Sequence, residues 1–216
     1  MVAGLTSCKK NGDLPPSVKN TTVNVINADS SALNFYQNGT RLNNISSLSP
    51  GSNTGYFYLP LNLPLTPEIY QVKKAGNPNY LIDNCKLTLD TSAYYSIFIA
   101  GETADKIFAI TDGGSTGTLL SQAAVRFVNA SPATTGLTVS LRDSLTFSGK
   151  AFKYASGFTN IGQGIATVKV YLPGSGTPIF TQSVTLTPGV LYTLFTKGIP
   201  GGTGNNALSA ILITNN

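Results

Sequence analysis

The sequence offers few side chains that could move protons or hold a metal ion. Its 216 residues include no histidine and only nine acidic residues, which are scattered along the chain. The lack of histidine excludes a Ser-His-Asp triad, a Cys-His pair and an imidazole-bound metal, because each needs that side chain. Paired-carboxylate chemistry is not expected from so few, widely spaced acids. We therefore expect a protein that is not an enzyme and that carries no cofactor.

Two weaker possibilities for chemistry remain. Glu102, Asp105 and Asp112 lie close enough in the chain to be considered as calcium ligands, but their spacing matches no calcium loop. We therefore predict no metal site. A hydrolase that combines a serine or threonine with Lys150 or Lys153 would require a pocket that brings such a pair together.

The N-terminal segment around Cys8 predicts a lipid anchor. Leu5-Thr6-Ser7-Cys8 places an aliphatic residue three positions before the cysteine and small residues directly before it. This pattern resembles the lipobox of bacterial lipoproteins, in which a peptidase cleaves before the cysteine and acyl chains are attached to it. Only seven residues precede Cys8, fewer than a signal peptide needs, so we expect either a misplaced start codon or a trimmed signal. The alternatives are a disulfide with Cys85 and an unmodified thiol.

The charge pattern argues against nucleic acid as a partner. The formal charge is +5, and its fourteen basic residues are scattered, with adjacent pairs only at 9–10 and 73–74. A nucleic-acid surface needs a denser basic stripe with interleaved aromatic residues. No apolar run reaches the roughly 18 residues that a membrane-spanning helix needs. The lipid on Cys8 is therefore the expected attachment to the membrane.

Tyr56 and Tyr58 lie in the densest aromatic segment, residues 55–60. On a strand they share one face, and Phe57 points to the other. An exposed tyrosine pair could stack on sugar rings, so these two residues are candidates for ligand binding. The alternative is a strand buried on one side, with Phe57 in the core and the tyrosines at its rim.

Three further polar residues are candidates for a modification or a structural role. Ser144, in Asp143-Ser144-Leu145, fits a short acidic-hydroxyl-aliphatic pattern used for O-glycosylation in Bacteroidetes. Asn27 and Asn129 end equivalent strands, where an asparagine side chain can accept a backbone N–H two residues further on and close an Asx turn. We expect this structural role for both asparagines, rather than contact with a ligand.

The chain repeats itself once. Residues 23–30 recur as 125–132, and residues 95–101 recur as 192–198, at offsets of 102 and 97 residues. The segments alternate apolar and polar residues with a period of two, are rich in threonine, valine and aromatic residues, and are separated by glycine and proline turns. A repeat of this length corresponds to a domain and not to a solenoid unit.

These patterns predict an all-β protein with two tandem, Ig-like antiparallel β-sandwich domains related by internal duplication. We expect a residual signal and tether over residues 1–20, a first domain over 21–114, a linker over 115–121 and a second domain over 122–216. Each domain is long enough to hold its own core.

The residues of the repeat resemble a known family. Val-Arg-Phe-Val-Asn-Ala-Ser-Pro at 125–132 is similar to the opening of the domain of unknown function 4397, and residues 185–198 are similar to its closing strands. The first domain resembles the family through the repeat, with Asp29-Ser30 in place of Ser131-Pro132. The resemblance implies a sandwich fold and an envelope lipoprotein of the kind found in Bacteroidetes. It implies no catalytic residue.

Together these features predict an outer-membrane lipoprotein of the cell envelope, without indicating the membrane face. It would act as a non-enzymatic spacer, adhesion or binding module with a protein or glycan partner. One alternative is a glycan-binding accessory protein of a polysaccharide-uptake system. Another is self-assembly through exposed sheet edges, which are ready templates for pairing.

Overall fold

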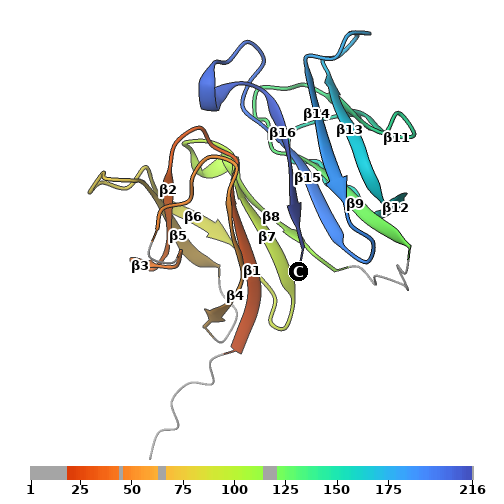
Figure 1. Cartoon of the computed structure of the whole chain (residues 1–216). Coiled ribbons are helices and arrows are strands. Elements are labelled where there is room, and N and C mark those ends of the chain that lie inside the picture. Colours follow the sequence, from red (N-terminus) through yellow and green to blue (C-terminus); the bar gives the residue numbers. More distant parts are fainter. Residues whose placement is uncertain (1–18, 44–45, 63–66, 114–120, 216) are drawn as a thin grey trace, which may run out of the picture.

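The protein is built from two β-sandwiches (Figure 1). The computed structural model describes residues 19–43, 46–62, 67–113 and 121–215. Each sandwich has two four-stranded sheets. The predicted all-β fold with two tandem sandwich domains is therefore confirmed. Among the described residues, no helical segment is long and apolar enough to cross a membrane.

The first domain contains eight strands and one short 3₁₀ turn, Ala104–Lys106. The strands are β1 (Lys19–Asn27), β2 (Leu33–Gln37), β3 (Thr40–Arg41), β4 (Asn53–Leu61), β5 (Glu68–Lys74), β6 (Ile82–Leu87), β7 (Tyr94–Ile99) and β8 (Ile107–Thr111). Asn38 and Gly39, both with positive φ, form the tight turn between β2 and β3, as an Asn-Gly pair favours.

The second domain repeats this pattern, with a 3₁₀ turn at Gly204–Asn206. Its strands are β9 (Gln122–Asn129), β10 (Leu137–Leu141), β11 (Leu145–Lys150), β12 (Thr159–Gly162), β13 (Gly164–Tyr171), β14 (Phe180–Leu186), β15 (Leu191–Lys197) and β16 (Ser209–Thr214). The expected linker, residues 115–121, lies almost entirely outside the described residues, as does the tether with Cys8.

The sheet orders show that the duplication is complete. One sheet of the first domain has the order β4-β1-β7-β8, and its counterpart in the second has β12-β9-β15-β16. We call these the inner sheets. The other two, with orders β3-β2-β5-β6 and β11-β10-β13-β14, are the outer sheets. Adding eight to each strand number of the first domain gives the order in the second.

The sandwiches are not purely antiparallel. The two central strands of each inner sheet are parallel, β1 with β7 and β9 with β15. All other pairs among the described strands are antiparallel. The sequence pattern missed this detail because a parallel pair joins strands that are distant in the chain, and alternation alone carries no strand direction.

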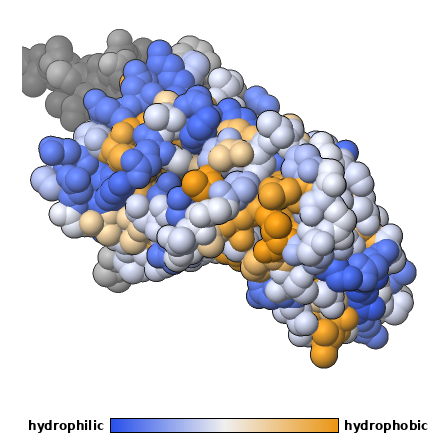
Figure 2. Space-filling view, turned by 90° about the horizontal axis from the view of Figure 1, so that it is seen from above, coloured by the Kyte–Doolittle hydropathy of each residue, from blue (hydrophilic) through white to orange (hydrophobic). Residues whose placement is uncertain are grey.

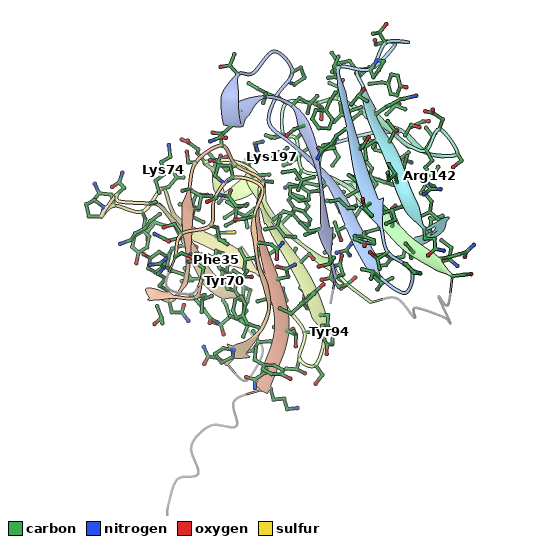
Figure 3. All side chains as sticks on the ribbon, viewed as in Figure 1. Phe35, Tyr70, Lys74, Tyr94, Arg142 and Lys197 are labelled. Carbon is green, nitrogen blue, oxygen red and sulfur yellow. The ribbon has the colours of Figure 1, made fainter. Side chains whose placement is uncertain are left out.

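Each domain has its own hydrophobic core between its inner and outer sheets. In the first core, the ring of Phe35 stacks on that of Tyr70, with centroids 5.3 Å apart (Figure 3). A third apolar cluster lies between the two inner sheets. The four sheets are therefore stacked in the order outer, inner, inner, outer, as Figure 1 shows from left to right.

Candidate functional site

The third apolar cluster joins the two domains, and we call it the domain junction. Its buried members come from both inner sheets: Ile26, Ala28, Phe98, Ala100 and Phe108 of the first domain, and Val128, Ala130, Phe195 and Ile213 of the second. The central strands β1, β7, β9 and β15 are consequently buried on both faces. Seen from above, the exposed surface is mostly polar, and apolar residues form separate areas on it (Figure 2).

Aromatic rings form the centre of the junction. Phe98 stacks on Phe108 with centroids 5.2 Å apart, and it meets the edge of Phe195 at 5.6 Å. Phe152 of the second domain approaches Phe108 edge-on at 5.7 Å. Such pairs add about 0.5–1.5 kcal/mol each beyond the area that they bury. The junction is therefore packed as a domain interior is, and not as a loose contact.

A buried ion pair lies beside these rings. Arg126 of β9 and Asp112, which follows β8, are 2.5 Å apart between Nη2 and Oδ1, and their side chains are only 3% and 4% exposed. The guanidinium also donates to Ser96 Oγ (3.0 Å), to Thr193 Oγ1 (2.8 Å) and to the carbonyl of Thr111 (3.2 Å). The guanidinium thus connects the two domains through the ion pair and three hydrogen bonds, which satisfy it as a buried arginine requires.

Tyr56 belongs to this junction. Its hydroxyl donates to Asp112 Oδ2 at 2.6 Å and accepts from Asn215 Nδ2 at 2.8 Å, so it contacts both domains. Ser96 Oγ donates to the same carboxylate oxygen at 2.8 Å. Burial, reinforced by the neighbouring Asp112 carboxylate, raises the pKa of Tyr56 well above its usual value. The hydroxyl therefore remains a donor over the whole neutral and mildly alkaline range.

The second candidate tyrosine has a different environment. Tyr56 and Tyr58 share one face of β4, but Tyr58 is 77% exposed. Phe57 points the other way and packs, partly buried, against the first core. Tyr94 of β7, which the sequence did not single out, is 56% exposed and lies near Tyr58. The exposed pair is therefore Tyr58 and Tyr94, and not Tyr56 and Tyr58.

Tyr58 and Tyr94 border a shallow groove of about 430 Å³ on the inner sheet of the first domain. Its lining residues are Lys19, Asn20, Thr22, Tyr58, Ser92 and Tyr94. Figure 3 shows Tyr94 at the end of the domain from which the described chain enters β1. The register explains the arrangement, because Thr22 of β1 pairs with Tyr58 on one side and with Tyr94 on the other.

The other predicted positions are accounted for as follows. Ser144 lies exposed in the turn between β10 and β11. Asn27 and Asn129 form the expected Asx turns, since Oδ1 of each accepts the backbone N–H two residues further on, at 2.9 and 3.0 Å.

Cys85 is a free, buried thiol, and burial raises its pKa to about 11. Cys8 lies outside the described residues.

The acidic and basic side chains considered for chemistry have other contacts. Glu102 pairs with Lys74 at 2.6 Å and Asp105 with Lys106 at 2.8 Å. The described residues contain no group of three potential metal ligands. The ammonium groups of Lys150 and Lys153 lie over the rings of Tyr154 and Phe152, 4.4 and 5.6 Å from the centroids.

Sequence reasoning missed the junction, although a signal was present. The segment 95–99 carries apolar residues on both faces, with Ile97 in the first core and Phe98 in the junction. The segment 192–196 repeats this, with Leu194 and Phe195. A strand that is apolar on both faces is typical of one covered on both sides.

Comparison with known proteins gives one result about family. A family model described as Domain of unknown function (DUF4397) matches residues 21–139 and 123–216. The two matches begin within β1 and β9, the equivalent first strands of the two domains. No curated protein matches the chain.

Proposed function

The chain belongs to the DUF4397 family through two successive matches, and on that premise we propose that it is a non-enzymatic lipoprotein of the cell envelope that acts as a rigid spacer or binding module. The junction is the observation that carries this proposal. Two domains joined by a linker move relative to each other unless their interface is large and hydrophobic. Here the interface has a continuous apolar cluster and a buried ion pair. Such a unit holds a fixed distance between its two ends.

Rigidity can be tested with two spin labels. Asn84 of β6 and Ser183 of β14 are exposed and lie on the two outer sheets. We expect a single narrow distance distribution for the chain labelled at both positions, in a Cys85→Ala background with Cys8→Ser. A broad distribution would contradict the proposal. A matched pair of labels within the second domain, at Ser183 and Thr146, gives the width expected of one folded body.

The lipid anchor requires a separate experiment. The proposal rests on Leu5-Thr6-Ser7-Cys8 alone. In cells fed an alkyne fatty acid, the protein should acquire label and fractionate with membranes, and Cys8→Ser should abolish both. Unlabelled protein in the membrane fraction would remove the acyl chain from the proposal.

We retain Ser144 as a proposed O-glycosylation site because it is exposed in a turn, where a transferase could reach it. A glycan mass that disappears in Ser144→Ala would support the assignment. An unmodified intact mass for protein purified from its native envelope would refute it.

A glycan-binding accessory protein is the second candidate function. The observation that favours it is the exposure of Tyr58 and Tyr94 on one face of the first domain. This candidate is compatible with the first, since a rigid spacer can carry a binding site at one end.

A further inference from the structure

We propose that the groove between Tyr58 and Tyr94 binds a neutral saccharide, whose ring stacks on the two phenol rings. The proposal rests on the binding role given above and adds a ligand class and a location to it. Five observations support it: the geometry of the row of residues across the inner sheet, the comparison between the two domains, the backbone conformation of Ser92, the positioning of Tyr94, and the chemistry of the lining residues.

The row of residues across the inner sheet forms a floor with two walls. Thr22 lies between Tyr58 and Tyr94, with one strand spacing on each side. Neighbouring strands lie about 4.8 Å apart, so the backbones that carry the two tyrosines are about 9–10 Å apart. A short side chain between two large exposed ones leaves a slot that is open to solvent, into which a flat ring can enter.

The second domain provides an internal comparison. By the same register, Ala124 of β9 is the counterpart of Thr22, and it pairs with Asn160 and Leu191. The two domains have the same sheet order, so this fold forms without aromatic residues at these positions. The tyrosine pair of the first domain therefore needs an explanation other than folding. A pair of exposed tyrosines also costs solubility, which a binding role would justify.

The backbone beside the groove gives the same indication. Ser92 has φ of +60° although it is not glycine, and its N–H donates to the carbonyl of Asn20 at 2.9 Å. The corresponding residue of the second domain is Gly189, with φ of +77°, and its N–H donates to Gln122. Non-glycine residues in this region are strained and tend to occur at functional sites. In the first domain the residue with this strained backbone is Ser92, whose side chain adds a hydroxyl to the groove.

Tyr94 is held in place by the junction. Its ring meets Tyr56 nearly edge-on, with centroids 5.9 Å apart and planes at 71°. Tyr56 is itself fixed by the hydrogen bonds of its hydroxyl to Asp112 and Asn215. One wall of the groove is therefore pre-organised, which reduces the entropy that a ligand must overcome on binding.

The lining residues select a neutral ligand that is rich in hydroxyl groups. Asn20, Thr22 and Ser92 can both donate and accept hydrogen bonds. Among the described residues that line the groove there is one cation, Lys19, and no carboxylate. A single exposed lysine is too little to favour a polyanion. A sugar ring fits both the tyrosine rings and the uncharged polar side chains of the groove, because its C–H face packs on an aromatic ring while its hydroxyls face polar groups.

Affinity electrophoresis tests the proposal. The Cys8→Ser chain would be run in native gels that contain a neutral polysaccharide, namely a β-glucan, an α-glucan, a mannan, a xylan or a galactan. We expect at least one polymer to retard the protein, and both Tyr58→Ala and Tyr94→Ala to weaken that retardation tenfold or more. Tyr80→Ala is the matched control, since Tyr80 is an exposed tyrosine of the same domain outside the groove. It should migrate as the parent protein does.

Three results would overturn the proposal. The first is that none of the polymers retards the protein. The second is that Tyr80→Ala weakens the retardation as much as the groove variants do. The third is that the protein binds phosphatidylethanolamine–phosphatidylglycerol vesicles in a way that depends on Tyr58, while no saccharide retards it. The last result would assign the groove to a membrane surface. Tyr58→Ala removes a side chain that is 77% exposed, so this variant folds even if Tyr94→Ala does not. We expect the distribution of spin-label distances to stay narrow in Tyr58→Ala. Loss of saccharide binding and loss of rigidity can therefore be observed separately.

Discussion

Replacement of Arg126 by methionine should strongly destabilise the protein. Removal of one partner from a buried ion pair typically costs about 3–5 kcal/mol, because the other charge is left uncompensated. Here Asp112 would keep the hydroxyls of Ser96 and Tyr56 as donors, which offsets part of that cost. Methionine retains most of the apolar contact of the arginine stem. We therefore expect a loss at the low end of this range, about 3 kcal/mol.

Urea unfolding of the Cys8→Ser chain, followed by circular dichroism, measures this loss. Lys169→Met is the matched control, because Lys169 and Asp143 form an exposed pair of similar length, 2.7 Å. Exposed pairs contribute about 0–1 kcal/mol. The double variant Arg126→Met with Asp112→Asn should be less destabilised than the sum of the two single variants, since it removes both charges together. A loss for Arg126→Met no larger than that for Lys169→Met would refute the view that this ion pair fixes the junction.

Three further predictions concern stability. Tyr70→Phe should stabilise the protein by about 1 kcal/mol in the same unfolding assay, because the buried Tyr70 hydroxyl has no hydrogen-bond partner among the described residues; a loss of stability would contradict this. Gly198→Ala should lower the melting temperature more than Gly174→Ala does, since both have positive φ but a Cβ at Gly198 would overlap the carbonyl of Ala207, whereas Gly174 faces open space. The free energy of unfolding should fall as the pH rises above about 8.5, the usual thiol pKa. Burial raises the pKa of Cys85 to about 11 in the folded chain, so the unfolded chain loses its thiol proton at a lower pH than the folded chain does. Melting temperatures at pH 8 and pH 10.5 check the sign, and Cys85→Ala should reduce the difference.

The strands and the duplication could be predicted because both are local properties of the chain. Alternation in segments such as 167–172 and the Asn-Gly turn at 38–39 depend on neighbouring residues only. The repeat of 23–30 at 125–132 then divides the strands between two domains. Each of these signals can be read without knowing which strands are paired.

The junction and the groove could not be predicted because they depend on pairing. Arg126 reads as a polar residue on the outward face of its strand until the other inner sheet covers that face. Tyr94 is far from Tyr58 in sequence, and only the pairing of both strands with β1 makes them neighbours. Tyr56 was correctly placed on the same face as Tyr58, but the sequence could not show that its hydroxyl is buried by the second domain.

The junction has the character of a two-fold interface within one chain. Phe98 and Phe195 occupy equivalent positions in the repeat, and they contact each other. In a symmetric dimer, residues near the two-fold axis meet their own counterparts in this way. The two equivalent inner sheets therefore supply the two halves of the interface, and they meet within one chain.

Differences between the two halves make the junction asymmetric. Ser96 donates to Asp112, and the equivalent Thr193 donates to Asn215. The charges occur only once, because Asn24 is the counterpart of Arg126 and Asn215 that of Asp112. One ionic contact in an otherwise similar interface costs desolvation, but it favours a single relative position of the two halves, as one buried polar residue does in a coiled coil. The asymmetry thus favours one defined arrangement of the junction, on which both the proposed fixed length of the module and the position of Tyr94 depend.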